Sequence, residues 1–230
     1  GSLDNPGTYD SVTPFMGNAI YIVDAEKGNL LLSISGSPGG ADIVVPDMNF
    51  SIPSIVRVFD TDSDGVDDRL YVGDTGGQVW RVDLAALALG DPYAPSHAGK
   101  TVVGKLADIS VSTVPAQRRR FFEPPSVIQV RDNQFSNESK YDYILMGTGY
   151  RAHPLNREVK DRFYAFRDFQ TGANEMRDDN ENNISDTTEG YPQASGNAYT
   201  NADLINVTTT VLDSSDATHR AAAGWFYDFT

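Results

Sequence analysis

The sequence predicts an all-β fold, and three features carry that prediction. Segments of alternating or β-branched residues, each bounded by glycine, asparagine, aspartate or proline, recur along the 230 residues, which is typical of short antiparallel strands. Helical periodicity is scarce, and a short aromatic–aspartate pattern recurs on several of the strand-like segments. We therefore expect a chain of antiparallel sheets.

Seven segments have the strand pattern. They are residues 19–24, 51–60, 69–73, 78–83, 126–130, 141–147 and 162–166. One segment, residues 84–89 (Leu-Ala-Ala-Leu-Ala-Leu), favours a helix, but Gly90-Asp91-Pro92 ends it after about a turn and a half.

Two long stretches lack both patterns. Residues 91–120 are expected to form a loop, which closes with the basic triplet Arg118-Arg119-Arg120. Residues 173–202 are rich in asparagine and acids and contain few side chains that a core could bury. This composition predicts an inserted flexible loop.

The recurring pattern places an aromatic residue three positions before an aspartate, on a strand that ends in a turn. Its copies are Tyr21-Ile-Val-Asp24, Trp80-Arg-Val-Asp83, the degenerate Tyr164-Ala-Phe-Arg167-Asp168, and Trp225-Phe-Tyr-Asp228. The aromatic positions lie 59, 84 and 61 residues apart. Chance is the alternative, because aromatic residues are common in strands and aspartate is common at strand ends.

A repeat of this length indicates the four-stranded antiparallel blades of a β-propeller. Propellers close with about 4–8 blades, whereas 230 residues at the observed spacing hold fewer than four. We therefore predict that residues 1–230 are part of a single modified β-propeller domain, a fragment of a larger ring.

Composition excludes several classes of function. The 32 acidic residues against 18 basic ones give a formal charge of −14, which disfavours binding to nucleic acid because the phosphate backbone is also an anion. The absence of cysteine excludes disulfides, thiolate metal sites and cysteine nucleophiles. No apolar run approaches the ~18–20 residues of a transmembrane helix, so no transmembrane segment is expected in this chain.

The most specific motif is the acidic run Asp60-Thr-Asp62-Ser-Asp64-Gly65-Val66-Asp67-Asp68. Aspartates stand at positions 1, 3, 5 and 9 of the run, and glycine stands at position 6. Calcium takes about 6–8 oxygen ligands, and alternate carboxylates on a tightly curled loop can all face one centre. Glycine permits the sharp bend that such a loop requires.

The run therefore predicts a Ca²⁺ site whose ligands are the side chains of Asp60, Asp62, Asp64 and Asp68 and the backbone carbonyl of Val66. It differs from an EF-hand because Tyr71 stands at position 12 and because its flanks are strands. No helix pair can open around it, which argues against a calmodulin-like sensor. Magnesium fits poorly because it demands a near-ideal octahedron. A solvated acidic turn is the alternative, and calcium could be regulatory or only structural.

Other candidate sites are weaker. Gly147-Thr-Gly149-Tyr-Arg-Ala152 resembles a dinucleotide fingerprint, but Pro154 and the β context deny it the helix that would bind a pyrophosphate. His97, His153 and His219 have no metal-binding spacing and are expected at the surface or in loops. The triplet Arg118–Arg120 could bind an acidic partner, although solvated arginines paired with Glu123 or Asp108 are the expected arrangement.

Residues 51–84, with the acidic run at their centre, closely resemble the PilY family of type IV pilus biogenesis factors and adhesins of Gram-negative bacteria. The likeness extends from about residue 17 to residue 170. Further stretches that carry it are Arg119-Arg-Phe-Phe-Glu-Pro-Pro125, Tyr143-Ile-Leu-Met-Gly-Thr-Gly-Tyr-Arg151, His153-Pro-Leu-Asn156 and Arg162-Phe-Tyr-Ala-Phe166.

This resemblance implies a C-terminal β-propeller domain in which a calcium loop regulates pilus extension against retraction and surface attachment, and thereby twitching motility and cell adhesion. The ligands carried over by motif are again Asp60, Asp62, Asp64, the Val66 carbonyl and Asp68. Some members bind integrin through an Arg-Gly-Asp tripeptide, which this sequence lacks. Integrin binding is therefore not expected.

We accordingly expect a non-enzymatic module that is exported to the cell surface, at a pilus tip or on the outer membrane. Its expected partners are pilus components such as minor pilins, and a host or abiotic surface. One alternative is a propeller enzyme, a quinoprotein-like oxidoreductase or a hydrolase, in which calcium is structural or holds a cofactor. Another is an adhesin that calcium only stabilises.

Overall fold

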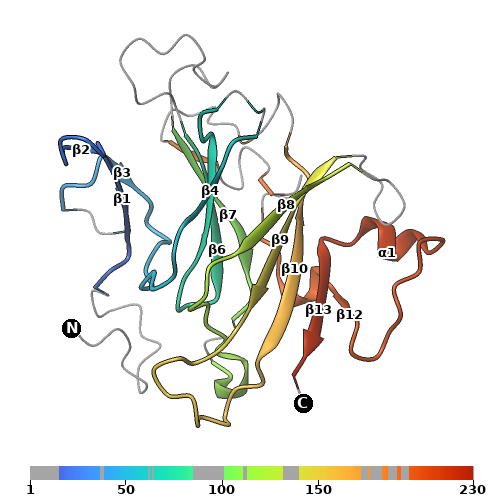
Figure 1. Cartoon of the computed structure of the whole chain (residues 1–230). Helices are drawn as coiled ribbons and strands as arrows, with labels where there is room; N and C mark the ends of the chain where they lie inside the picture. Colours follow the sequence, from blue (N-terminus) through green and yellow to red (C-terminus); the bar gives the residue numbers. More distant parts are fainter. Residues whose placement is uncertain are drawn as a thin grey trace.

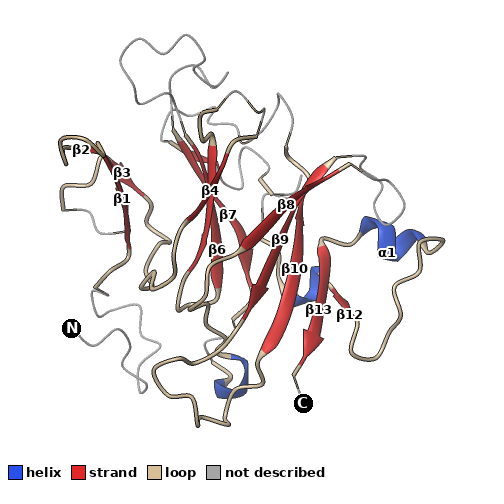
Figure 2. Ribbon diagram, in the orientation of Figure 1, coloured by secondary structure: helices blue, strands red, loops and turns tan. Residues whose placement is uncertain are grey.

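The computed structural model describes residues 16–36, 39–61, 63, 65–84, 101–110, 113–131, 140–171, 176, 183–185, 191–192 and 197–229. These residues form three β-sheets that lie side by side (Figures 1 and 2). The first sheet contains β1 (Ala19–Val23), β2 (Leu30–Ser35) and β3 (Ile43–Val44). No helix among the described residues has the length and the apolar character that crossing a membrane requires.

The second and third sheets each have five strands. The second has the order β11-β7-β6-β5-β4, and the third has the order β12-β13-β10-β9-β8. The second-sheet strands are β4 (Arg57–Phe59), β5 (Arg69–Gly73), β6 (Gln78–Asp83), β7 (Val102–Asp108) and β11 (Ile184–Ser185). The third-sheet strands are β8 (Ser126–Val130), β9 (Tyr141–Gly147), β10 (Arg162–Asp168), β12 (Ile205–Asn206) and β13 (Gly224–Asp228).

Both five-stranded sheets follow one plan, in which four strands pair antiparallel and a short fifth strand adds in parallel at one edge. β11 pairs with β7, and β12 pairs with β13. The expectation of purely antiparallel four-stranded sheets therefore needs correction. The extra strands are parallel because each reaches its neighbour through a long connection rather than a hairpin.

Two hydrophobic clusters lie on opposite faces of the second sheet, which is why β5 and β6 are buried along their whole length. Leu70, Val72 and Trp80 belong to the cluster shared with the first sheet. Tyr71 and Val79 belong to the cluster shared with the third sheet. Successive side chains of a strand alternate between these faces, so every odd-numbered side chain of β5 and β6 points toward the third sheet.

Most of the predicted strands are confirmed. β5, β6, β8 and β9 have the predicted bounds, and β1 and β10 differ from them by one or two residues. The segment 51–60 is a strand only at β4. Pro53 lies within the lost part, and proline cannot donate to a strand ladder.

The expected loop at 91–120 is wrong at its centre, where β7 occupies residues 102–108. β7 is buried on both faces, so its sequence lacks the alternation that marks a half-exposed strand. β2 was not predicted either. Within 173–202, the few described residues include the buried Met176, Tyr191 and Tyr199, whereas we expected little of that segment to be buried.

Three copies of the aromatic–aspartate pattern lie in three different sheets, on β1, β6 and β10. The fourth copy does not begin a further sheet. Trp225 stands on β13, which pairs with β10 so that Trp225 faces Ala165. The residues of the expected short helix after Leu84 lie outside the described part of the chain.

Candidate functional site

The acidic run lies at one end of the second sheet, between β4 and β5 (the upper end in Figure 1). Phe59 and Arg69 pair across the two strands and bracket it, and the Asp68 N–H donates to the Phe59 carbonyl at 3.2 Å. Ser63 and Gly65 adopt positive φ angles of 72° and 95°, a region that glycine enters without strain. The described residues of the run therefore turn tightly between the two strands.

Asp60 turns its carboxylate into the loop. Its Oδ1 accepts the Ser63 N–H at 2.6 Å, and its Oδ2 accepts the Gly65 N–H at 2.8 Å. Asp68 does the same from the other end, because its Oδ2 accepts both the N–H and the hydroxyl of Thr61 at 2.7 Å. The structure thus directs the first and last predicted ligands inward on a single loop.

Three predicted ligands remain, of which the structure describes one. Val66 is described and about one-third exposed, while Asp62 and Asp64 lie outside the described residues. Among the described residues no cluster of three metal-binding side chains is found. The donors of the loop are all hard oxygens, two of them carboxylates already held by backbone N–H groups, and this set fits calcium in chemistry. The calcium site therefore remains a prediction, and the oxygen donors of the loop are compatible with it.

A buried charge cluster begins one residue after the loop. Asp68 faces the loop, and Arg69 points to the other side of β5, into the space between the second and third sheets. Arg69 Nε donates to Asp83 Oδ1 on β6 at 2.7 Å, and Arg69 Nη1 donates to Asp142 Oδ2 on β9 at 2.7 Å. Arg69 therefore joins the two sheets directly.

Arg81 makes a second junction of the same kind. Its guanidinium contacts Asp83 through Nε at 2.8 Å and Nη2 at 2.5 Å, and Nη1 donates to Asp168 Oδ2 at 2.8 Å. The hydroxyls of Tyr71 and Tyr191 donate to the same Asp168 oxygen at 2.7 and 2.9 Å. The arginine and aspartate side chains of this charge cluster are at most 2% exposed.

The charge cluster contains two guanidiniums and three carboxyl groups. Burial opposes ionisation of Asp83, but the Arg81 and Arg69 guanidiniums outweigh it and hold the pKa of Asp83 well below its usual range. Burial raises the pKa of Asp142; the Arg69 guanidinium opposes this rise, and the neighbouring Asp168 adds to it. Burial thus acts in the same direction on Asp83 and Asp142, but only Asp83, which both guanidiniums contact, has its pKa lowered.

Burial also raises the pKa of both tyrosines well above the ordinary phenol value. Tyr71 and Tyr191 therefore remain neutral donors to Asp168. Sequence reasoning missed the charge cluster and interpreted Asp83 and Asp168 as residues that precede turns. The available signal was the presence of Arg69, Arg81 and Asp83 on strands that are otherwise apolar, since buried charges require partners.

The structure also describes most of the weaker candidate sites, which are the dinucleotide-like segment and the histidines. Residues 148–161 contain no helix, as expected, and the Thr148 and Gly149 N–H groups donate to backbone carbonyls. His153 is exposed, His219 is partly exposed, and His97 lies outside the described residues.

The expectation of solvated arginines in the basic triplet is wrong for Arg119 and Arg120, which are buried. Arg119 Nε donates to the Lys160 carbonyl, and the Arg120 guanidinium lies 4.2 Å from the Tyr150 ring centre. Their polar and aromatic partners make burial possible.

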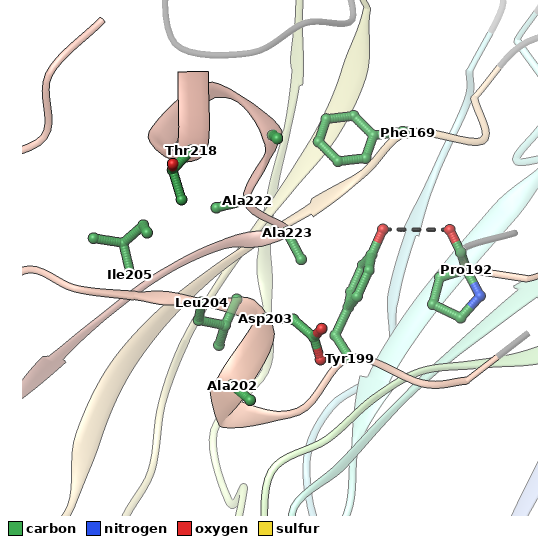
Figure 3. A pocket seen from close by; sticks show the side chains of 11 residues that line it. Phe169, Pro192, Tyr199, Ala202, Asp203, Leu204, Ile205, Thr218, Ala222 and Ala223 are labelled. Atoms are coloured by element: carbon green, nitrogen blue, oxygen red, sulfur yellow. Dashed lines mark hydrogen bonds between the residues drawn. The ribbon is translucent and has the colours of Figure 1, made fainter. Parts of the chain in front are cut away.

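A cavity of about 410 Å³ lies beside the short helix α1 (Ala217–Ala221) (Figure 3). Its lining is mostly apolar and includes Phe169, Leu204 and three consecutive alanines. Its polar groups already have internal partners. The Tyr199 hydroxyl donates to the Pro192 carbonyl, and Asp203 accepts from Thr200 in a capping box. No catalytic arrangement results from these contacts.

No family model matches the chain. The type IV pilus biogenesis factor PilY1 of Pseudomonas aeruginosa, from strains PAO1 and PAK, is 36% identical over 88 residues, which is 36% of this chain and 7% of the relative. The chain thus matches about 7% of the length of these relatives.

The crystal structure of the Pseudomonas aeruginosa PilY1 C-terminal domain matches the fold with a TM-score of 0.53 and 20% sequence identity. The match covers 92% of this chain and 44% of that domain. The local sequence identity and the shared fold together support a likeness of this chain to the C-terminal domain of the PilY family.

Proposed function

We propose that the chain is a calcium-binding module of a type IV pilus biogenesis factor, in which calcium orders the loop at residues 60–68 and regulates pilus extension against retraction and surface attachment. The observation that carries the proposal is the closed loop itself, with Asp60 and Asp68 both directed inward. The relatives that share this fold or sequence are named for pilus biogenesis, which supports a pilus role and a non-enzymatic one.

Calcium acts in this proposal by offsetting charge. The loop gathers five carboxylates within nine residues, and their mutual repulsion opposes the curled conformation. A dication held by Asp60, Asp62, Asp64, Asp68 and the Val66 carbonyl reverses the local field. The backbone N–H groups bound to Asp60 lower the repulsion only in part, so the ion remains the main source of order.

The module would act outside the cell, on the surface of a Gram-negative bacterium and at a pilus tip or the outer membrane. Its partners would be pilus components such as minor pilins, together with a host or abiotic surface. A formal charge of −14 favours partners that present basic faces.

The three sheets would be successive blades of a larger propeller ring. The outward face of the first sheet exposes Tyr21, Val23 and Leu30, and that of the third sheet exposes Ile128 and Tyr227. Apolar sheet faces of this kind are normally covered. The matched PilY1 domain is more than twice as long as its aligned part, which supports further sheets at these two faces.

Calorimetric titration with calcium tests the site. The wild-type chain should bind one ion with a Kd of about 10⁻⁶ to 10⁻³ M. Asp68→Asn should abolish binding, because it removes a charged ligand while its amide oxygen can still accept from Thr61. The matched control is Asp24→Asn, which changes another turn aspartate that accepts two backbone N–H groups. Negligible heat from the wild-type chain, or equal binding by Asp68→Asn, would refute the site.

The pilus role has a separate test in cells. A strain whose own PilY protein carries Asp68→Asn, at wild-type abundance, should show altered pilus retraction and twitching. Normal twitching with a calcium-free loop would limit calcium to a stabilising role.

A further inference from the structure

The last ligand of the proposed calcium loop and the buried charge cluster are neighbours in the sequence. Asp68 is fixed by the second sheet on both sides, since its N–H donates to the Phe59 carbonyl and its own carbonyl accepts the Leu84 N–H at 2.7 Å. The next residue, Arg69, is 1% exposed and binds Asp142 in the third sheet. A displacement of Asp68 therefore moves the backbone that carries Arg69.

Two further contacts join the same loop to the third sheet. The Phe59 ring stacks on the Tyr71 ring, with centroids 6.0 Å apart and planes 11° apart. Tyr71 in turn donates to Asp168. Gln129 Nε2 on β8 lies 3.5 Å from the Thr61 carbonyl, at the outer limit of a hydrogen bond. These contacts lie at the start of the loop, and Arg69 follows its end. Both ends of the loop are therefore connected to the third sheet.

Resting on the calcium site proposed above, we propose that Arg69 and Asp142 are positioning residues for that site. Their hydrogen bond ties Asp68 to β9, so that calcium binding at the loop and packing between the second and third sheets strengthen each other. By linkage, the free energy by which calcium binding stabilises the junction of the sheets equals the free energy by which the junction strengthens calcium binding. Calcium in this arrangement acts on the junction between two sheets as well as on its own loop.

The test compares calcium affinity in two variants of Asp142, both measured by calorimetry on the whole chain with calcium alone as the probe. Asp142→Ala removes the acceptor of Arg69 Nη1 and should raise the calcium Kd at least about fivefold, the lower end of usual coupling. Asp142→Asn keeps an amide oxygen for the same bond and should stay within about twofold of wild type. Rescue by the amide separates positioning from the charge of Asp142.

Asp228→Ala is the matched control. It removes an Arg162–Asp228 ion pair of 2.5 Å in the same sheet, at the end of β10 away from Asp168. This variant should lose stability without any change in calcium Kd, because no contact described for it leads to the loop.

Hydrogen exchange on the wild-type chain gives a second readout that needs no variant. Calcium should slow exchange in β9 (Tyr141–Gly147) as well as in the loop. Slowing confined to residues 57–70, or a wild-type Kd in Asp142→Ala, would overturn the coupling while leaving the calcium site intact. Failure of the wild-type chain to bind calcium would instead refute the site itself.

Discussion

Asp74 shows how a single buried carboxyl shapes a hairpin. It lies in the turn between β5 and β6, where its Oδ1 accepts the N–H groups of Gly76 and Gln78 and its Oδ2 accepts the Trp80 indole N–H at 2.9 Å. Burial raises its pKa to about 7, although these three donors favour the charged form. Asp74 therefore titrates close to neutral pH in the folded chain.

This pKa predicts a pH dependence of stability. An unfolded aspartate has a pKa of about 3.9, so between pH 4 and pH 7 the folded state binds the proton more tightly than the unfolded state. The contribution of Asp74 to stability is therefore present below pH 4 and is lost as the pH rises through 7. Asp74→Asn lacks this titration.

We expect the free energy of unfolding of wild type to fall relative to that of Asp74→Asn by roughly 3 kcal/mol between pH 4 and pH 7.5. Denaturant titrations of both proteins at several pH values measure the difference. A difference that is constant with pH would mean that Asp74 stays ionised throughout.

The charge cluster predicts a contrast between two aspartates. Asp142→Asn should lower the free energy of unfolding less than Asp83→Asn does, because burial already disfavours the charged form of Asp142 and the amide oxygen can still accept from Arg69. Asp83→Asn should cost about 3–5 kcal/mol, because Asp83 binds both guanidiniums and its loss leaves buried positive charge uncompensated. Denaturant unfolding measures both variants. Equal costs would contradict this ranking of the two carboxyl groups.

At the scale of elements, the β10–β13 pairing depends on Gly224. Its φ is 145°, and a Cβ there would lie 1.9 Å from the Ala165 carbonyl oxygen, a backbone atom that a side-chain rotation cannot move. Gly224→Ala should therefore displace β13 and destabilise the chain by several kcal/mol, more than the usual cost of about 1 kcal/mol for a point substitution.

Gly149→Ala is the control, since a Cβ at that position meets nothing within 4 Å. Thermal unfolding should separate the two variants clearly. A Gly224→Ala chain as stable as Gly149→Ala would mean that β13 does not pair with β10 as described.

Whether the sequence predicts a strand depends on whether one or both faces of that strand are buried. β8 alternates exposed with partly buried residues along most of its length, β9 alternates partly buried with buried ones, and the bounds of both were predicted. β7 is buried on both faces and was assigned to a loop. Local spacing also predicted the acidic loop, whose residues are neighbours in the chain. The Arg69–Asp142 contact joins residues 73 positions apart, and no local pattern encodes it.

At the scale of the whole molecule, the formal charge of −14 means that calcium could stabilise the folded chain in two ways. Any salt screens repulsion among surface carboxylates and raises stability slightly. A specific site stabilises the folded state by mass action, by about 2.7 kcal/mol when free calcium is 100 times the Kd. The two effects differ in their dependence on the ion and on the loop.

We expect saturating calcium to raise the melting temperature of the chain by roughly 5–10 °C, given about 2–4 °C per kcal/mol for a domain of this size. Magnesium or sodium chloride at equal ionic strength should raise it much less, because neither ion suits an irregular set of oxygen ligands at calcium distances. In Asp68→Asn all three salts should act alike, whereas Asp24→Asn should respond as wild type does. Equal shifts from calcium and magnesium in the wild-type chain would assign the whole effect to screening.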